Sequence, residues 1–131
     1  MPAPLHPPDP LSDADYRRLC DAVLAQIETT LDRWLEEDVI DIDAHRSGGL
    51  LELAFPAGTK IVVNAQPPLQ ELWLAARAGG YHFRYDGLAW HEREGREFFE
   101  LLSRLASEQA GRPLRFSPPG EVGASTATLT P

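Results

Sequence analysis

The chain has 131 residues, 43% of them hydrophobic, and a formal net charge of −8, which suits one globular domain with one packed core. No apolar run approaches the roughly 20 residues of a membrane-spanning helix, and the N-terminus is proline-rich and lacks the features of a signal peptide. The acidic balance disfavours nucleic acid and anionic lipid, which select basic surfaces. We therefore expect a soluble protein that binds cations or basic protein surfaces, not nucleic acid or a membrane.

The single cysteine, Cys20, excludes an internal disulfide and a cysteine-based zinc or iron–sulfur site, because these need several thiolates. A lone cysteine fits a reducing compartment, so we expect a cytoplasmic protein. Cys20 falls on the apolar face of a predicted helix, where we expect it to be buried and unreactive.

Both ends of the chain are predicted to be disordered tails. Residues 1–11 contain five prolines, and residues 117–131 are small, polar and interrupted by proline and glycine. Neither segment has a periodic apolar face. Residues 12–116 are therefore predicted to form the folded domain.

The first predicted element is a long amphipathic helix. Ser12 is a candidate N-cap, and Asp13 and Asp15 follow it in the first turn, where the helix dipole favours negative charge. Apolar residues then recur at spacings of three and four, which predicts a helix that ends near Glu36: Tyr16, Cys20, Val23, Ile27, Leu31 and Trp34.

Alternation of apolar and polar residues then predicts three strands, over 39–44, 51–55 and 60–64. Short turns at 47–49 and 56–58 join them, which indicates an antiparallel meander. In the first of these strands, Asp41 and Asp43 share one face, opposite Ile40 and Ile42.

Further strands are predicted over 69–76, 81–85 and 88–91, with turns at Gly79–Gly80 and Asp86–Gly87. A second amphipathic helix is predicted from Arg96 to Gln109, with Gly111 as its C-cap. This order favours an α+β fold, a two-layer α-β sandwich. Its N- and C-terminal helices pack on one face of a five- or six-stranded antiparallel sheet, and the other face is open to solvent.

Acidic residues are concentrated in one region, since ten acidic and three basic residues lie between Ser12 and Asp43. Spacings of seven, four and four place four of them on one stripe of the first helix, and four more continue it toward the first strand. We call this set the acidic ridge: Asp21, Glu28, Asp32, Glu36, Glu37, Asp38, Asp41 and Asp43.

Two interpretations of the acidic ridge stay open at this point. The ridge is either a solubilising face or a binding surface for hard cations such as ferrous, ferric, calcium or manganese ions. No histidine or cysteine lies among the carboxylates to close a tight site. Cation binding is therefore expected to be weak, rich in water and exchangeable.

Trp73 is the second candidate functional residue. It alternates with Leu72 and Leu74, so it faces solvent if the leucines face the helices. An exposed tryptophan is typical of a protein-binding anchor, and Asn64 and Gln66 lie close upstream as hydrogen-bonding groups. The alternative is that Trp73 packs under a loop or under the C-terminal tail.

The other residues with reactive or metal-binding side chains do not form a recognisable site. His45, His82 and His91 lack the spacing of a metal site, and we expect them at exposed sheet or loop positions. No nucleophile, phosphate-loop or dinucleotide motif is present, so we expect no enzyme activity.

The combination of several short motifs resembles the frataxin family, in its bacterial form. The motifs are Asn64-x-Gln66-x-Pro68, Leu72-Trp73-Leu74-Ala75 and Gly79-Gly80-Tyr81-His82-Phe83, and they follow the acidic helix and a Gly48–Gly49 turn. The likeness covers about residues 12–116. It implies two helices on one antiparallel sheet, iron binding on the acidic ridge, and association with the cysteine desulfurase and scaffold protein of iron–sulfur cluster assembly.

The resemblance also implies site residues. Asn64, Gln66 and Trp73 become the candidate partner-binding residues. Thr29 and Arg33 stand where bacterial relatives commonly carry acids, which implies a lower iron capacity. The candidate iron-binding residues, for weakly bound ferrous and ferric ions, are Glu28, Asp32, Glu36, Glu37, Asp38, Asp41 and Asp43.

Three functional hypotheses follow. The first is a non-catalytic iron-binding protein of iron–sulfur cluster assembly, which donates iron, regulates the desulfurase, or does both. The second is a ferroxidase that oxidises and detoxifies iron, although the Glu-x-x-His motifs of di-iron centres are missing. The third is an acidic adaptor without a physiological metal. We expect a monomer, with iron-dependent oligomerisation as the alternative.

Overall fold

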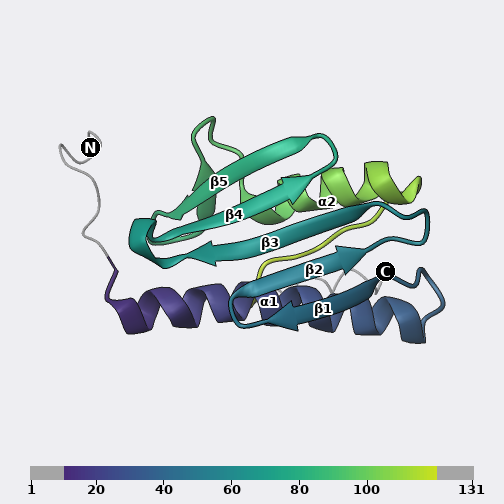
Figure 1. Ribbon diagram of the computed structural model, residues 1–131, viewed down its shortest axis with the longest axis horizontal. Coiled ribbons are helices and arrows are strands. Elements are labelled where there is room, and N and C mark those ends of the chain that lie inside the picture. Colours follow the sequence, from purple (N-terminus) through teal and green to yellow (C-terminus); the bar gives the residue numbers. More distant parts are fainter. Residues whose placement is uncertain (1–10, 121–131) are drawn as a thin grey trace, which may run out of the picture.

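The computed structural model describes residues 11–120 (Figure 1). Most of the two predicted tails, over 1–11 and 117–131, lies outside the described residues. Leu11 is described, and its backbone exchanges two hydrogen bonds with the side-chain amide of Gln70, at 3.0 and 2.6 Å. None of the helices within residues 11–120 has both the length and the hydropathy to cross a membrane.

Helix α1 spans Asp13–Glu36, as its apolar period predicted. The hydroxyl oxygen of Ser12 accepts a hydrogen bond from the Asp15 amide at 3.0 Å, which confirms Ser12 as the N-cap. The buried Tyr16 hydroxyl accepts a hydrogen bond from the Gln66 amide and donates one to the Glu71 carbonyl. The start of α1 is thereby fixed to the segment that joins two central strands.

The sheet has six strands, and each strand pairs antiparallel with its neighbour in the chain. The predicted meander of five or six strands is therefore confirmed with six. A short 3-10 helix, η1 (Pro67–Leu69), replaces the start of the strand predicted over 69–76. The strands are β1 (Asp43–Ser47), β2 (Leu50–Ala54), β3 (Lys60–Gln66), β4 (Glu71–Ala76), β5 (Gly79–Tyr85) and β6 (Trp90–Glu92).

Several boundaries differ from the predictions. The first strand begins at Asp43 and not at 39, because Asp38 takes a left-handed conformation (φ 59°) that turns the chain after α1. Asp41 therefore lies in a connection and not on a strand face. The turn predicted at Gly79–Gly80 lies at 77–78, and both glycines belong to β5. The last strand covers Trp90–Glu92, later than the predicted 88–91.

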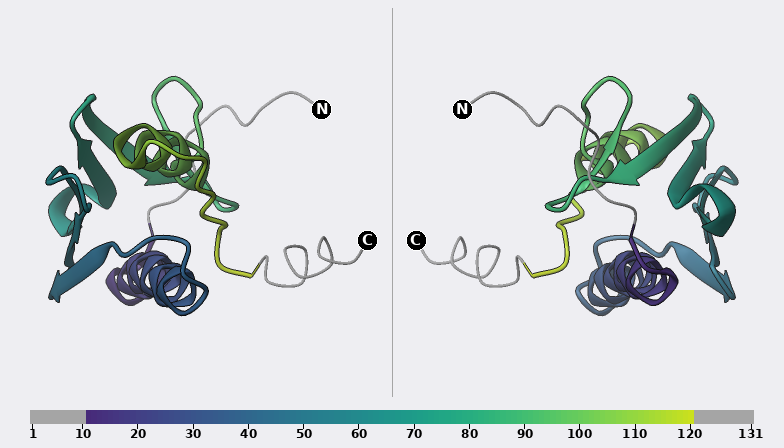
Figure 2. Two further views of the ribbon diagram at one scale, coloured as in Figure 1. Left: turned by 90° about the vertical axis from the view of Figure 1, so that its right-hand side faces the viewer. Right: turned by 90° about the vertical axis from the view of Figure 1, so that its left-hand side faces the viewer.

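Helix α2 spans Phe98–Ala110 and ends at Gly111, whose φ of 72° confirms it as the C-cap. Figure 2 shows α1 and α2 on the same side of the sheet, so the predicted two-layer α-β sandwich is confirmed. The core lies between these layers, where Ile27, Leu53 and Leu102 are fully buried. The opposite face of the sheet, which we call the open face, carries no helix of the described chain.

The segment after α2, residues 112–117, returns between the two helices on the side away from the sheet (Figure 2). Leu114 and Phe116 are buried there, and the Phe116 ring lies 4.8 Å from the Trp34 ring of α1. The Ser103 and Ser107 hydroxyls of α2 accept hydrogen bonds from the amides of Phe116 and Leu114. This segment therefore joins α1 to α2.

Candidate functional site: the acidic ridge and the open face

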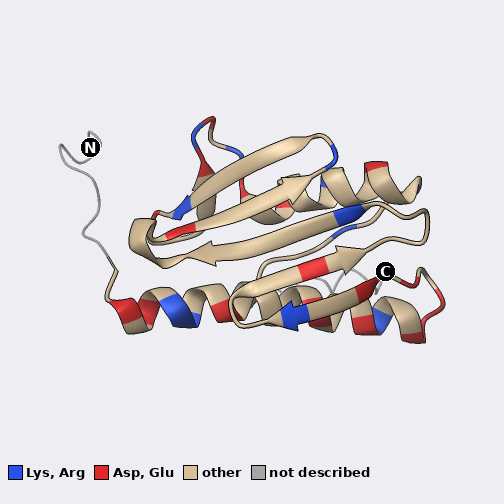
Figure 3. Ribbon diagram, in the orientation of Figure 1, with Lys and Arg blue, Asp and Glu red and all other residues tan. Residues whose placement is uncertain are grey.

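The acidic ridge follows α1 and its connection to β1, along which Figure 3 marks several acidic residues in red. Its first four members lie on α1, Glu37 is the C-cap of that helix, and Asp43 begins β1. Asp38 and Asp41 lie in the connection between them. Every member is exposed except Glu28, which is half-buried.

Three of these carboxylates lie where the backbone disfavours them. Glu36, Glu37 and Asp38 stand at the C-terminal end of α1, which carries the partial negative charge of the helix dipole. Each charge of the wrong sign at a helix end costs about 0.3–1 kcal/mol at low ionic strength. Within residues 11–120 no basic side chain makes an ion pair with any of the three. The stability of the helix therefore does not account for this arrangement.

The ridge does not form a closed metal centre. Between residues 11 and 120, no three acidic, histidine or cysteine side chains are gathered closely enough to hold an ion. In addition, Arg46 of β1 binds two ridge members, with Nη1 at 2.8 Å from Glu28 and Nη2 at 3.2 Å from Asp21. An ion on this surface would therefore keep most of its water ligands.

Trp73 lies half-buried on the open face, while Leu72 and Leu74 point into the core. Its ring stacks on His82 of β5, with the centroids 4.1 Å apart and the planes 5° apart. Its indole N–H donates to Glu71 at 2.8 Å. Residues 112–117 pack on the helices, on the other side of the sheet from Trp73. Most of the C-terminal tail that the alternative interpretation placed over Trp73, residues 117–131, lies outside the described residues.

The two predicted amide side chains lie beside Trp73. Asn64 is directly opposite Trp73 in the β3–β4 pair, and Gln66 is opposite Glu71. All three candidate partner-binding residues therefore share one patch of the open face. We call Asn64, Gln66, Trp73 and His82 the tryptophan patch.

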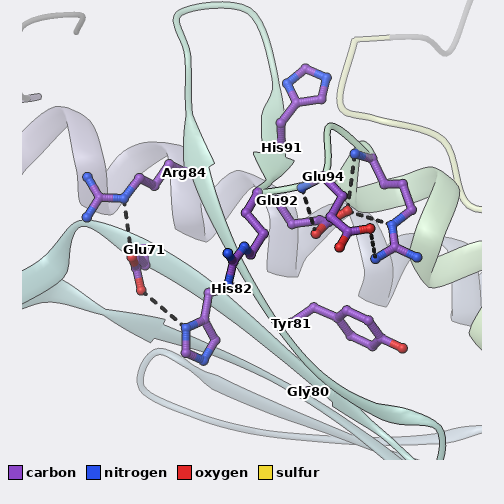
Figure 4. Close-up of a pocket in the computed structure, with 10 residues that line it drawn as sticks. Glu71, Gly80, Tyr81, His82, Arg84, His91, Glu92 and Glu94 are labelled. Atoms are coloured by element: carbon purple, nitrogen blue, oxygen red, sulfur yellow. Dashed lines mark hydrogen bonds and ion pairs between the residues drawn. The ribbon is translucent and has the colours of Figure 1, made fainter.

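A hollow of about 560 Å³ adjoins this patch, between β5 and the loop that precedes α2. Figure 4 shows His82 and Arg84 reaching toward Glu71, with Arg84 Nε at 3.2 Å from its carboxylate. On the far wall the Arg96 guanidinium binds Glu92 at 2.5 Å, and it also lies over the Tyr81 ring. Several of the side chains around the hollow are thus held in place by ion pairs.

The Glu92–Arg96 pair predicts a pH-dependent contribution to stability. Arg96 binds the ionised carboxylate, and this holds the pKa of Glu92 below its ordinary value of 4.5. Because the pKa is lower in the folded chain, the stabilisation is complete above pH 4.5 and is lost as the pH falls below that value. We expect Glu92→Gln to lower the free energy of unfolding at pH 7 by about 1–2 kcal/mol.

Urea unfolding from pH 7 downward checks this expectation, and the difference between Glu92→Gln and the natural protein should shrink below pH 4.5. Glu94→Gln is the matched control, because the Glu94 carboxylate is 70% exposed and lies 4.0 Å from the same arginine. Equal effects of the two substitutions would show that the Glu92–Arg96 pair stabilises the fold no more than the exposed contact of Glu94 does.

The remaining residues singled out in the sequence lie outside the acidic ridge and the tryptophan patch. Cys20 is buried, and burial raises the pKa of its thiol to about 11, so it stays protonated at neutral pH. His45 is exposed on β1, and His91 lies 2.9 Å from the Asp86 carboxylate. Among the residues that the structure describes, neither histidine belongs to a metal-binding group.

Comparisons with known proteins identify the family of this chain. A family model described as a frataxin-like domain matches residues 9–112, which is most of the chain. The chain belongs to the frataxin family. It is 50% identical over 108 residues to the iron–sulfur cluster assembly protein CyaY of Variovorax paradoxus, covering 82% of this chain and 98% of that one. It is 49% identical over 109 residues to the CyaY protein of Paraburkholderia phymatum, covering 82% and 100%.

Solved structures of frataxins show the same fold. Frataxin from Psychromonas ingrahamii matches with a TM-score of 0.71 and 32% identity, over 82% of this chain and 99% of that chain. A trimeric frataxin from Saccharomyces cerevisiae, solved in complex with ferrous iron, matches with a TM-score of 0.59 and 24% identity, over 80% and 91%. At that identity the yeast structure supports the fold alone.

Two residues of this frataxin domain were missed by the sequence analysis. A turn at Gly79–Gly80 would set Trp73 opposite Asp86, so the misplaced turn hid the pairing of Trp73 with His82. Arg46 was missed because the predicted strand ended at 44. The alternation of the strand could have revealed it. Arg46 is an even number of residues from the buried Ile42, so the two side chains lie on the same face and Arg46 faces α1.

Proposed function

We propose that this frataxin-family protein acts in iron–sulfur cluster assembly as a non-enzymatic iron-binding protein. Ferrous and ferric ions bind weakly on the acidic ridge, at Glu28, Asp32, Glu36, Glu37, Asp38, Asp41 and Asp43. The observation that carries this proposal is the group of exposed carboxylates at the C-terminal end of α1, which oppose the helix dipole and have no ion-pair partner within residues 11–120. Oxygen ligands without histidine or cysteine suit hard cations.

We further propose two protein partners, the cysteine desulfurase and the scaffold protein of cluster assembly. The acidic ridge suits a basic surface of the desulfurase, and the tryptophan patch suits a hydrogen-bonding and aromatic contact. The protein donates iron to the complex or adjusts the rate of sulfur transfer, and it acts in the cytoplasm. It is proposed to work as a monomer.

An NMR titration tests the ridge as a surface shared by iron and the desulfurase. The natural protein is titrated with ferrous ion under anaerobic conditions and, in a separate experiment, with the desulfurase. Shifted or broadened amide signals between 28 and 43 are expected in both. Signals that change with the desulfurase alone would identify an acidic adaptor. Catalytic, saturable oxygen consumption with ferrous ion would identify a ferroxidase.

A further inference from the structure

Arg46 is the one basic side chain of the described chain that is paired with the acidic ridge. Its position on β1 places its side chain on the same face of the sheet as the core residues. It therefore points to α1 and not to the open face. Its two terminal nitrogens bind two different carboxylates, Glu28 at 2.8 Å and Asp21 at 3.2 Å. These acids are two helical turns apart on the same stripe of α1.

The surroundings of this guanidinium make it a strong competitor for other cations. The Arg46 side chain is only 29% exposed and Glu28 only 34% exposed, so water screens their attraction less than it screens a surface pair. The guanidinium is also tethered to β1, so it is present at its site without any binding equilibrium in solution. By contrast, Asp32 lies one turn beyond Glu28 and has no ion-pair partner between residues 11 and 120.

We propose that Arg46 is an internal counter-ion that withdraws Asp21 and Glu28 from cation binding. Hard divalent cations then bind only to the part of the acidic ridge from Asp32 to Asp43. This inference rests on the proposed function, and it corrects one member of the proposed iron-binding set, because Glu28 is already occupied by the guanidinium. Arg46 determines which carboxylates of the acidic ridge are available to a cation, and it does not itself touch the bound ion.

Calorimetric titration with Mn²⁺ at near-physiological salt tests the proposal through two matched neutralisations. Glu28→Gln and Asp32→Asn remove the same charge from the same helix, one turn apart. In the natural background, Asp32→Asn should weaken Mn²⁺ binding severalfold, and Glu28→Gln less than twofold. In an Arg46→Gln background, Glu28→Gln should become as damaging as Asp32→Asn. Equal losses in the natural background, or a loss at Glu28 that Arg46→Gln does not change, would overturn the proposal.

Urea unfolding of Arg46→Gln, Glu28→Gln and the double variant separates this inference from the proposed function. If the guanidinium holds Glu28, the double variant should be less destabilised than the two single effects added together. Additive effects would overturn the inference whatever the metal does. If the natural protein binds no Mn²⁺ and no ferrous ion, the proposed function fails, while non-additive unfolding and Mn²⁺ binding gained in Arg46→Gln would still support the counter-ion.

Discussion

Trp73→Ala should weaken binding to the desulfurase–scaffold complex by about 2 kcal/mol or more, which is roughly a thirtyfold rise in Kd. The indole is half-buried, stacks on His82 and is oriented by Glu71, so it is held in place before a partner binds. A rigid tryptophan loses little conformational freedom on binding, which is one reason such residues dominate interfaces. Surface plasmon resonance with the purified complex measures the change.

Leu88→Ala is the matched control for Trp73→Ala. Leu88 is an apolar side chain that is 89% exposed, in the loop between β5 and β6, and it lies outside the tryptophan patch. Its truncation should leave the affinity unchanged. Thermal unfolding completes the test, because Trp73→Ala should leave the fold intact and lower the Tm by only a few degrees, through loss of the His82 stack and the Glu71 hydrogen bond. Normal binding with a much lower Tm would instead make Trp73 a packing residue of the sheet.

Neutralising and reversing the charges at the end of α1 should remove most of the iron binding. We choose Glu36→Lys, Glu37→Lys and Asp38→Asn together, with asparagine at 38 because the left-handed backbone there tolerates it better than lysine. Anaerobic titration with ferrous ion should show affinity that is lower by at least about tenfold, equivalent to 1.4 kcal/mol. Unchanged affinity would place the iron site elsewhere.

The same triple variant should be at least as stable as the natural protein. Lysine at the C-terminal end of a helix interacts favourably with the dipole, and repulsion between neighbouring carboxylates is relieved. We expect the free energy of unfolding to rise by about 0.5–1 kcal/mol. Glu94→Gln, Glu100→Lys and Glu108→Lys change the net charge equally at exposed positions off the ridge, so they control for the overall charge. This second variant should keep its iron affinity.

The parts of the fold that were predictable from the sequence are those with a strong local period. Helix α1 repeats its apolar residues over about five turns, and its N-cap and the C-cap of α2 follow from Ser12 and Gly111. The open position of Trp73 followed from simple alternation with its neighbouring leucines. These features need no knowledge of how distant segments meet.

The errors arose where two local signals competed. Val39–Ile42 alternates like a strand, but the chain uses these residues to turn from α1 to β1, with Asp38 in a left-handed conformation. Gly79–Gly80 suggests a turn, yet the turn falls two residues earlier. A shift in a hairpin turn changes every cross-strand pair, so the Trp73–His82 stack could not be predicted. The ion pairs of Arg46 depend in turn on how β1 lies against α1.

The way in which residues 113–117 are attached has a consequence for local opening. The amides of Leu114 and Phe116 donate to side-chain hydroxyls of α2, and no backbone-to-backbone hydrogen bond holds this described segment. The segment can therefore detach while every strand pair of the sheet stays intact, which exposes the Trp34 ring and opens the space between the helices. Native-state hydrogen exchange should show these two amides exchanging well before those of β3 and β4, so that the helix layer loosens while the sheet is still whole.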